Sequence, residues 1–371
     1  MVSTGLADLH ARLQAGAQQA GLAGFGVCRV EPFADTRTEM ERRLTSGEAG
    51  RARFTYRDPH AATDIRQTYQ WAERLVVGSV GYLPAAGDPG PPVSNTGRIA
   101  RFATADHYAP LRSALVHLAG LLRSAGHRAE VLVDDNRLVD RAAAVRAGVA
   151  WWGKSTMALA PRFGPWLLLG SIVTDAPLPV ADPMVRDCGT CTACIPACPT
   201  GALDTEGVLD ATKCISYWAQ TPGPIPPEVR SAWGDRFYGC DDCLDACPPG
   251  QRLAAGSSTP AGRVDLVDIL ETSDEALLEE FGHFYIPRRD PHYLRRNAVI
   301  ALGHSGDSRA VPAVVDQLHS DAAFVRTQAA WALGRIGGPM ARAALSDALR
   351  HESDPEALAE IERALYESEG S

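Results

Sequence analysis

Several features of secreted, membrane and nucleic-acid-coating proteins are missing from this sequence. The first residues, MVSTGLADLHARLQAG, lack a basic segment followed by an apolar core, and they lack a twin arginine. We therefore expect no export signal. No apolar run approaches the roughly eighteen residues that a membrane span needs. The net charge of −9 excludes a protein that coats nucleic acid through overall positive charge. We expect a cytoplasmic, globular chain with no membrane partner.

Alternating amphipathic and apolar segments predict an α/β domain over residues 1–180. Helices are expected at 5–20, 110–126 and 136–148, and apolar strands at 25–30, 74–83, 129–135 and 166–175. Glycines inside the strands make the strand boundaries harder to place. A loop rich in Pro and Gly occupies 84–97, and a proline-rich linker at 175–183 leads into the cysteine-containing segment.

Two related units near the C-terminus predict a helical repeat module at 256–371. RRNAVIALG (295–303) and RTQAAWALG (326–334) are 31 residues apart, and each is followed by a second helical pattern. Small residues at helical spacing, closed by glycine, are typical of paired helices that bury their faces by stacking. The module resembles HEAT repeats.

Eight of the nine cysteines lie between residues 188 and 247. CGTCTACIPACP (188–199) is a C-x2-C-x2-C-x3-C-P run, and CDDCLDACP (240–248) ends in Cys-Pro as well. In two-cluster ferredoxins, three thiolates of such a run bind one Fe4S4 cluster and the fourth binds the other. We therefore predict a ferredoxin-like iron–sulfur domain at 181–255 with two clusters. The first set is Cys188, Cys191, Cys194 and Cys247; the second is Cys198, Cys214, Cys240 and Cys243.

Zinc is the alternative for these thiols, because C-x2-C also occurs in zinc knuckles. The triple C-x2-C-x2-C line favours iron–sulfur. The ninth cysteine, Cys28, is interpreted as a buried apolar residue. The segment between Cys214 and Cys240 is longer than an electron carrier requires, and it contains two tryptophans and two tyrosines. This insertion suggests that the domain also forms the wall of a site in the α/β domain.

The stretch GVAWWGKST (148–156) matches the phosphate-loop pattern, but its context disfavours that interpretation. A phosphate loop follows a strand and opens a helix, whereas this stretch follows a predicted helix and runs toward a strand. Gly148 is well placed to end the helix. We interpret the stretch as a helix-to-strand turn, in which Lys154 and Ser155 are available to a polar cofactor.

Taken together, these segments resemble the epoxyqueuosine reductases, cobalamin-dependent iron–sulfur enzymes of tRNA modification. The resemblance covers the whole chain in family order. It is carried by LVDD (132–135), AGVAWWGKST (147–156), LLLGSIVTDAPLP (167–179), CGTCTACIPACPTGAL (188–203), CISYW (214–218), YGCDDCLDACP (238–248) and LRRNAVIALGHSGD (294–307).

The resemblance implies that cobalamin, reduced through the two clusters, acts on the epoxide of the tRNA base while Asp134 supplies a proton. Asp135 is the alternative acid. The implied cofactor contacts are Arg57, Arg101, Tyr108, Asp134, Trp152, Gly153, Lys154, Ser155, Ser216, Tyr217, Gly239, Asp241 and Asp242. The sequence has no D-x-H-x-x-G motif that would mark a histidine ligand for cobalt. It departs from the family pattern around His107 and at Asp140, where the family typically has glutamate before Arg141.

Basic residues in FYIPRRDPHYLRRN suggest a tRNA-binding surface, namely Arg288, Arg289, Arg295 and Arg296. Arginines with interleaved aromatics suit phosphate contacts and base stacking. We expect a monomer that takes electrons from an external donor. Two alternatives remain open, a cobalamin iron–sulfur reductase of small molecules resembling reductive dehalogenases, and a non-catalytic electron-transfer module.

Overall fold

The computed structural model describes residues 2–83, 94–254 and 262–369. Contacts divide the chain into two compact units. Unit 1 comprises 1–85, 106–212 and 242–257, and unit 2 comprises 86–105, 213–241 and 258–371. Most of the Pro/Gly-rich loop and the predicted boundary between residues 255 and 256 lie outside the described residues. Because the ferredoxin-type segment contributes to both units, the division at 180 and 255 stays a prediction.

A four-stranded antiparallel sheet with the order β1-β2-β7-β4 forms the centre of unit 1. Its strands are β1 (Gly24–Arg29), β2 (Arg74–Gly81), β4 (Ala129–Val133) and β7 (Leu167–Thr174). The helices and short strands of this unit are α1 (Val2–Gln19), α2 (Ala34–Ser46), α3 (Arg53–Tyr56), α4 (Pro59–Thr63), α5 (Tyr108–Ser124), α6 (Asp140–Arg146), β5 (Trp151–Trp152), β6 (Ala158–Leu159), α9 (Asp242–Asp245) and α10 (Pro248–Ala254). The predicted alternation of helices and apolar strands is thus confirmed.

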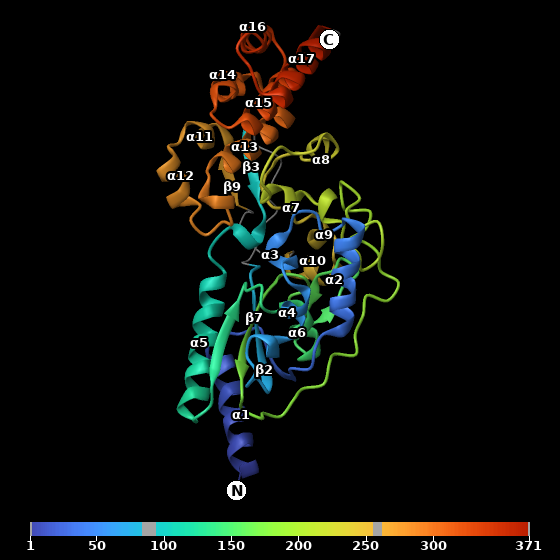
Figure 1. The fold of residues 1–371 in the computed structure, drawn as a ribbon, viewed down its shortest axis with the longest axis vertical. Helices are drawn as coiled ribbons and strands as arrows, with labels where there is room; N and C mark the ends of the chain where they lie inside the picture. The colour runs from blue at the N-terminus through green and yellow to red at the C-terminus, as the bar shows by residue number, and fades with distance from the viewer. Residues whose placement is uncertain (1, 84–93, 255–261, 370–371) are drawn as a thin grey trace. The chain divides into compact units, whose positions relative to one another are not determined.

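Two glycines in the strands allow α5 to approach the sheet closely. Gly78 in β2 and Gly170 in β7 are register partners. A Cβ on Gly78 would lie 3.0 Å, and a Cβ on Gly170 2.7 Å, from the methyl groups of Leu115 in α5. The helix lies along β4 and β7 (Figure 1). These strand glycines are therefore points of close packing rather than strand ends.

The opposite face of the sheet packs on α6, whose alanines are buried. Ala142, Ala143 and Ala144 lie in one apolar core with Leu75 and Val77 of β2. Cys28 belongs to the same core, and burial raises the pKa of its thiol to about 12. The structure therefore agrees with its interpretation as a buried apolar residue.

Unit 2 joins a small sheet to a stack of helices. Its strands have the order β8-β3-β9, and they are β3 (Thr96–Ile99), β8 (Arg236–Tyr238) and β9 (Arg263–Asp265). Its helices are α7 (Ile215–Ala219), α8 (Pro227–Ser231), α11 (Leu266–Glu271), α12 (Asp274–Glu280), α13 (His292–Ser305), α14 (Val311–Asp316), α15 (Ala323–Ile336), α16 (Pro339–Ala348) and α17 (Pro355–Glu369). The repeated units at 295–303 and 326–334 lie in α13 and α15, which contact each other, so the predicted paired helices are confirmed.

None of the helices in the described ranges is long and apolar enough to cross a membrane.

Candidate active site and iron–sulfur cysteines

Asp134 is the first residue after β4, and its backbone is unusual. The predicted strand continued to Asp135, but β4 ends at Val133. The chain turns at Asp134 with φ of 52°, the left-handed region that few non-glycine residues adopt. Such strain concentrates at functional sites. Its side chain is exposed, so a substrate can reach it.

The two neighbouring aspartates differ in their electrostatic surroundings. Desolvation by the surrounding protein raises the pKa of Asp134, the negative charge of Asp135 raises it further, and Arg112 opposes the shift. Asp135 accepts hydrogen bonds from the backbone N–H (2.9 Å) and Nε (2.8 Å) of Arg137, and this pairing lowers its pKa. Asp134 is thus the better candidate for the proton donor, because its surroundings disfavour the charged form.

Asp140 is a second acid whose charge interacts with that of Asp134. It is the first residue of α6, which starts later than the sequence suggested. The helix predicted at 136–148 begins at Asp140, after a turn in which Asp135 bonds the backbone of Arg137. Asp140 Oδ1 is buried and has no hydrogen-bond partner within the described residues. Burial raises the pKa of Asp140 well above its usual range, and the charges of Asp134 and Asp135 add to this shift.

Tyr108 and Arg141 complete this group in unit 1. Burial, with help from the charges of Asp134 and Asp140, raises the pKa of Tyr108, so the phenol stays protonated. The surrounding protein lowers the pKa of Arg141, although its side chain keeps an exposed face. Arg141 donates a hydrogen bond to the carbonyl of Thr156 at 3.3 Å. This contact links the acid group to the turn that contains Lys154 and Ser155.

The turn at 148–156 has the predicted order of helix, turn and strand. Gly148 adopts φ of 67° two residues after α6 ends, and β5 begins at Trp151. The phosphate-loop pattern is therefore accidental, because no helix follows it to present its N–H groups. The Trp152 ring is 43% exposed, and Ser155 is buried. An exposed aromatic ring next to polar groups suits a large cofactor that is partly apolar.

Lys154 ties this turn to the segment that follows the first cysteine run. Its Nζ lies 2.9 Å from Glu206 Oε1, and its carbonyl accepts a hydrogen bond from Gly207 N–H at 2.8 Å. Lys154 is also a charged neighbour of Cys194. The turn and the cysteine segment therefore hold each other in place within unit 1.

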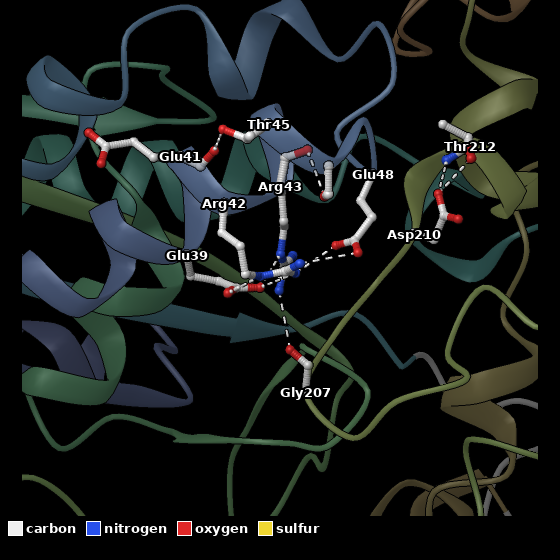
Figure 2. Close-up of polar contacts among 10 residues, drawn as sticks. Glu39, Glu41, Arg42, Arg43, Thr45, Glu48, Gly207, Asp210 and Thr212 are labelled. Atoms are coloured by element: carbon white, nitrogen blue, oxygen red, sulfur yellow. Dashed lines mark hydrogen bonds and ion pairs between the residues drawn. The ribbon is translucent and has the colours of Figure 1, made fainter.

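A network of ion pairs formed by α2 and Glu48 also contacts the segment that follows the first cysteine run (Figure 2). Arg42 bonds Glu39 at 2.8 Å and Glu48 at 2.6 Å. Arg43 bonds Glu39 at 2.6 Å and reaches the carbonyl of Gly207 at 3.2 Å. Hydrogen bonds from these arginines lower the pKa of Glu39 to about 2. The network anchors the chain between Cys198 and Cys214.

The four thiols of the first set lie near one another in unit 1. Burial is the main cause that raises the pKa of the Cys247 thiol to about 11, and the negative charges of Cys188, Cys194 and Cys191 add to it. Cys247 is distant in sequence from the other three, so its proximity agrees with the proposed set. All nine cysteines are described, and none forms a disulfide.

The cysteines of the second set occupy ends of elements in both units. Cys214 precedes α7, Cys240 follows β8, Cys243 lies in α9, and Cys198 Sγ accepts a hydrogen bond from Ala202 N–H at 3.2 Å. Within the described residues, no three Cys, His, Asp or Glu groups converge as a single metal ion requires.

The remaining predicted cofactor contacts are distributed over both units. In unit 2, Arg101 and Asp241 are brought together. The backbone N–H of Arg101 donates to Asp241 Oδ2 at 2.7 Å, and its guanidinium lies 3.6 Å from the same oxygen. Gly239 adopts φ of 78°, and a Cβ there would lie 2.5 Å from Ala100. Ser216 and Tyr217 lie in α7, while Arg57 is exposed at the end of α3 and Asp242 begins α9.

The four arginines predicted to contact tRNA are not equivalent. Arg288 and Arg289 are exposed, with φ of 55° and 56°, and Tyr285 beside them is 60% exposed. Arg295 forms an ion pair with Asp274 at 2.6 Å and is mostly covered. Arg296 is fully buried.

The expectation that Arg296 contacts tRNA is therefore wrong for this structure. Its guanidinium donates to the carbonyls of Trp218, Thr221 and Gly223 at 2.9, 2.7 and 2.6 Å. Burial lowers the pKa of Arg296 to about 9. The side chain fixes the aromatic insertion to α13 inside unit 2.

We predict that Arg296→Met destabilises the protein by about 2–4 kcal/mol, because buried carbonyls lose their donors. Urea unfolding of the purified chain measures the change. Arg309→Met is the control, since the Arg309 side chain is 75% exposed. Equal stability of the two variants would contradict the role given to Arg296.

Sequence reasoning noted Asp140 only as a departure from the family pattern, and it did not single out Arg112. An aspartate at the start of a helix is ordinary, because it favours the positive end of the helix dipole. Only the tertiary structure shows that Oδ1 of Asp140 is buried and that the charge of Asp134 acts on this carboxyl group. Arg112 lies in α5, where its sequence suggests an exposed helix position, yet it contacts the carbonyl of Val133 at 3.5 Å.

Comparison with known proteins agrees with this organisation. Residues 187–250 match the 4Fe-4S double cluster binding domain, and residues 286–366 match HEAT repeats. Curated relatives include an epoxyqueuosine reductase of Bacillus anthracis, 37% identical over 70% of this chain and 71% of the relative. Another is that of Staphylococcus aureus, 31% identical over 87% of both chains.

Solved structures extend the similarity to nearly every residue. The chain is similar to a crystal structure of epoxyqueuosine reductase with a TM-score of 0.90 and 30% identity, covering 98% of this chain and 100% of the other. It is also similar, with a TM-score of 0.89, to an epoxyqueuosine reductase bound to an epoxyqueuosine-modified tRNA-Tyr stem loop. A Bacillus subtilis structure with a TM-score of 0.88 is described as having its catalytic aspartate loop swung out of the active site. By sequence and by fold, this chain belongs to the epoxyqueuosine reductase family.

Proposed function

We propose that this chain reduces epoxyqueuosine to queuosine at the wobble position of tRNA, with Asp134 as the proton donor. The observation that carries the proposal is the similarity to epoxyqueuosine reductases over 98% of the chain. The raised pKa of Asp134 supports its role, because an acid works best when its pKa lies near the operating pH. The two Fe4S4 clusters and cobalamin, when bound, store electrons and supply a strongly reducing cobalt centre.

The residues present suit these groups. Eight reduced thiols are available, and Cys247 lies near Cys188, Cys191 and Cys194. The exposed Trp152 ring, with Lys154 and Ser155 on the same turn, suits a large cofactor with polar side groups. We assign the cobalamin contacts to the thirteen residues that the family resemblance implies, from Arg57 to Asp242. An external donor supplies the electrons.

A reductase of small molecules is the competing function. The helical repeats favour tRNA, because Arg288, Arg289 and Tyr285 expose two positive charges and one aromatic ring together. Such a combination suits phosphate contacts and stacking on an unpaired base. A small substrate has no need of it.

The test of the proposed function is anaerobic reconstitution with iron and sulfide, followed by incubation with tRNA that carries epoxyqueuosine. Mass analysis of the nucleosides measures queuosine with cobalamin present and absent. We expect product only when cobalamin and a reductant are both present. Equal product without cobalamin would contradict the proposal.

We predict that the double change Arg288→Ala and Arg289→Ala weakens tRNA binding and lowers its dependence on salt. Each removed phosphate contact reduces the slope of log affinity against log salt by about 1. Fluorescence anisotropy with a labelled anticodon stem loop at several salt concentrations measures both effects. Arg350→Ala is the matched control in the same unit, because Arg350 is also exposed (64%) and lies next to Asp347. An unchanged slope in the double variant would place the tRNA elsewhere.

A further inference from the structure

The short helix α7 begins directly after a cysteine that the proposed ligand sets assign to the second cluster. Cys214 caps the N-terminal end of α7, and the backbone N–H of Trp218 donates to the carbonyl of Cys214 at 3.1 Å. At a rise of about 1.5 Å per residue, this helix is only about 8 Å long. Because so short a helix moves as one body, a shift of its far end also moves Cys214. This inference rests on the clusters of the proposed function.

Two buried residues of α13 hold the far end of α7. Arg296 donates to the carbonyls of Trp218 and Thr221 at 2.9 and 2.7 Å. Asn297 Nδ2 donates to the carbonyl of Ala219 at 3.1 Å. Both side chains are fully buried. The last carbonyls of a helix lack their usual partners further along the helix, and these two side chains supply donors in their place.

Arg296 and Asn297 also fix each other, and we call them the Arg–Asn pair. Nε and Nη2 of Arg296 donate to Asn297 Oδ1 at 3.1 and 3.0 Å. The Arg296 guanidinium lies over the Tyr293 ring, 5.2 Å from its centre. A planar guanidinium presents its donors in fixed directions, whereas a lysine ammonium is a single point charge on a flexible stem. The pair is therefore a rigid connection between α13 and α7.

The strand that leads to Cys240, another ligand of the same set, has additional support. β8 contacts both α13 and α7 and ends at Tyr238, two residues before Cys240. The Tyr238 ring stacks on Phe284 with the ring centres 4.0 Å apart, and its hydroxyl donates to the carbonyl of Tyr285 at 2.9 Å. These contacts do not involve the Arg–Asn pair. Loss of the pair should therefore loosen Cys214 before Cys240.

We propose that Arg296 and Asn297 are positioning residues for the second Fe4S4 cluster. By fixing the end of α7, they hold the Cys214 thiol in place and limit how often it moves away from the cluster. The reduction potential of a cluster depends on hydrogen bonds to its sulfurs and on its exposure to solvent, so the pair also influences that potential. The repeat module thus supports electron storage in addition to the proposed tRNA contacts.

The experiment compares Asn297→Ala and Arg296→Lys, which weaken the pair, with matched controls in the repeated helix α15. The controls are Thr327→Ala and Arg326→Lys. Thr327 is buried and bonds a carbonyl of its own helix, and Arg326 bonds Glu352. Each chain is reconstituted anaerobically with iron and sulfide, and the transfer of iron to a ferrous chelator is followed by absorbance.

We expect half of the iron to leave Asn297→Ala and Arg296→Lys faster than it leaves the wild type. The increase should be about fivefold, the factor that loss of one hydrogen bond gives in a local opening equilibrium. The other half should leave at the wild-type rate, because the first cluster does not depend on α7. Both controls should release iron as the wild type does. If Arg296→Lys does not fold, Asn297→Ala decides the result.

Two cysteine variants identify which cluster responds. After reduction, Cys214→Ser should lack the electron paramagnetic resonance signal of the second cluster, and Cys247→Ser should lack that of the first. Redox titration of Asn297→Ala should show a shifted potential for the signal that is missing from Cys214→Ser. The signal that is missing from Cys247→Ser should titrate as in the wild type. A merely structural role of the pair would leave both potentials unchanged in the folded protein.

The results separate this inference from a general loss of stability and from the proposed function. Release of all the iron at one faster rate, or equal release from Asn297→Ala and Thr327→Ala, would overturn the inference. A shift confined to the first cluster would overturn it as well. None of these measurements uses tRNA or cobalamin. A wild type that holds both clusters but does not convert epoxyqueuosine would therefore refute the proposed function alone.

Discussion

Asp134→Asn should reduce turnover of epoxyqueuosine tRNA by about 10²–10⁴-fold, the usual contribution of a positioned general acid. The amide keeps the size of the side chain but cannot donate a proton to a leaving oxygen. Because the pKa of Asp134 is raised, the wild-type carboxyl group stays protonated at higher pH than an ordinary aspartate. The wild-type rate should therefore fall as the pH rises through that pKa. Nucleoside mass analysis at several pH values measures the rate.

Asp135→Asn is the matched control for this prediction. It alters the adjacent residue by the same chemical change, but Asp135 is held by Arg137 as a carboxylate. We expect its turnover to stay within the same order of magnitude as the wild type. If Asp135→Asn loses activity and Asp134→Asn keeps it, the assignment is displaced by one residue. Iron content and tRNA binding should be equal in both variants.

Cys247→Ser should remove one Fe4S4 cluster and abolish turnover. The wild type should hold about eight iron atoms per chain, since each cluster has four, and the variant should hold about four. Serine oxygen is a poor substitute for thiolate, and Cys247 is the member of its set that lies far away in sequence. Iron and sulfide analysis after anaerobic reconstitution measures the loss, and the visible absorption should fall by about half.

Cys28→Ala is the control for the iron measurement. Cys28 lies in the apolar core of unit 1, with its Sγ 3.9 Å from the carbonyl of Ala143. This variant should bind iron as the wild type does. Retention of eight iron atoms by Cys247→Ser would contradict the proposed ligand set. A wild type that binds zinc in place of iron would contradict the clusters altogether.

Short-range patterns were enough to predict most elements of unit 1 and the helical repeats. The spacing of apolar residues marked β2, β7, α5 and α13, because a strand or helix that packs on a core must present one apolar face. Gly148 marked the end of α6, because a helix often ends at a glycine with positive φ. The predictions failed between Asp134 and Val139, where a turn replaces both a strand end and a helix start. Side-chain bonds from Asp135 to Arg137 stabilise that turn, and propensity does not reveal them.

The arginines of the repeat module show a second limit of prediction from local sequence patterns. Arg288 and Arg296 lie in the same basic stretch, yet one is exposed and the other is fully buried. The carbonyls of Trp218, Thr221 and Gly223, more than seventy residues earlier in the chain, form hydrogen bonds with Arg296. No local pattern in the sequence indicates these partners.

The amino-acid sequence alone determined which atoms are available for chemistry. Eight thiols at iron–sulfur spacing, an aspartate after an apolar strand and a pair of repeated helices follow from residue type and order, which are local properties. Only the tertiary structure decided which charges are stabilised and which are suppressed. It paired Asp135 with Arg137, buried Oδ1 of Asp140 and enclosed Arg296, because desolvation depends on neighbours that are brought together by folding.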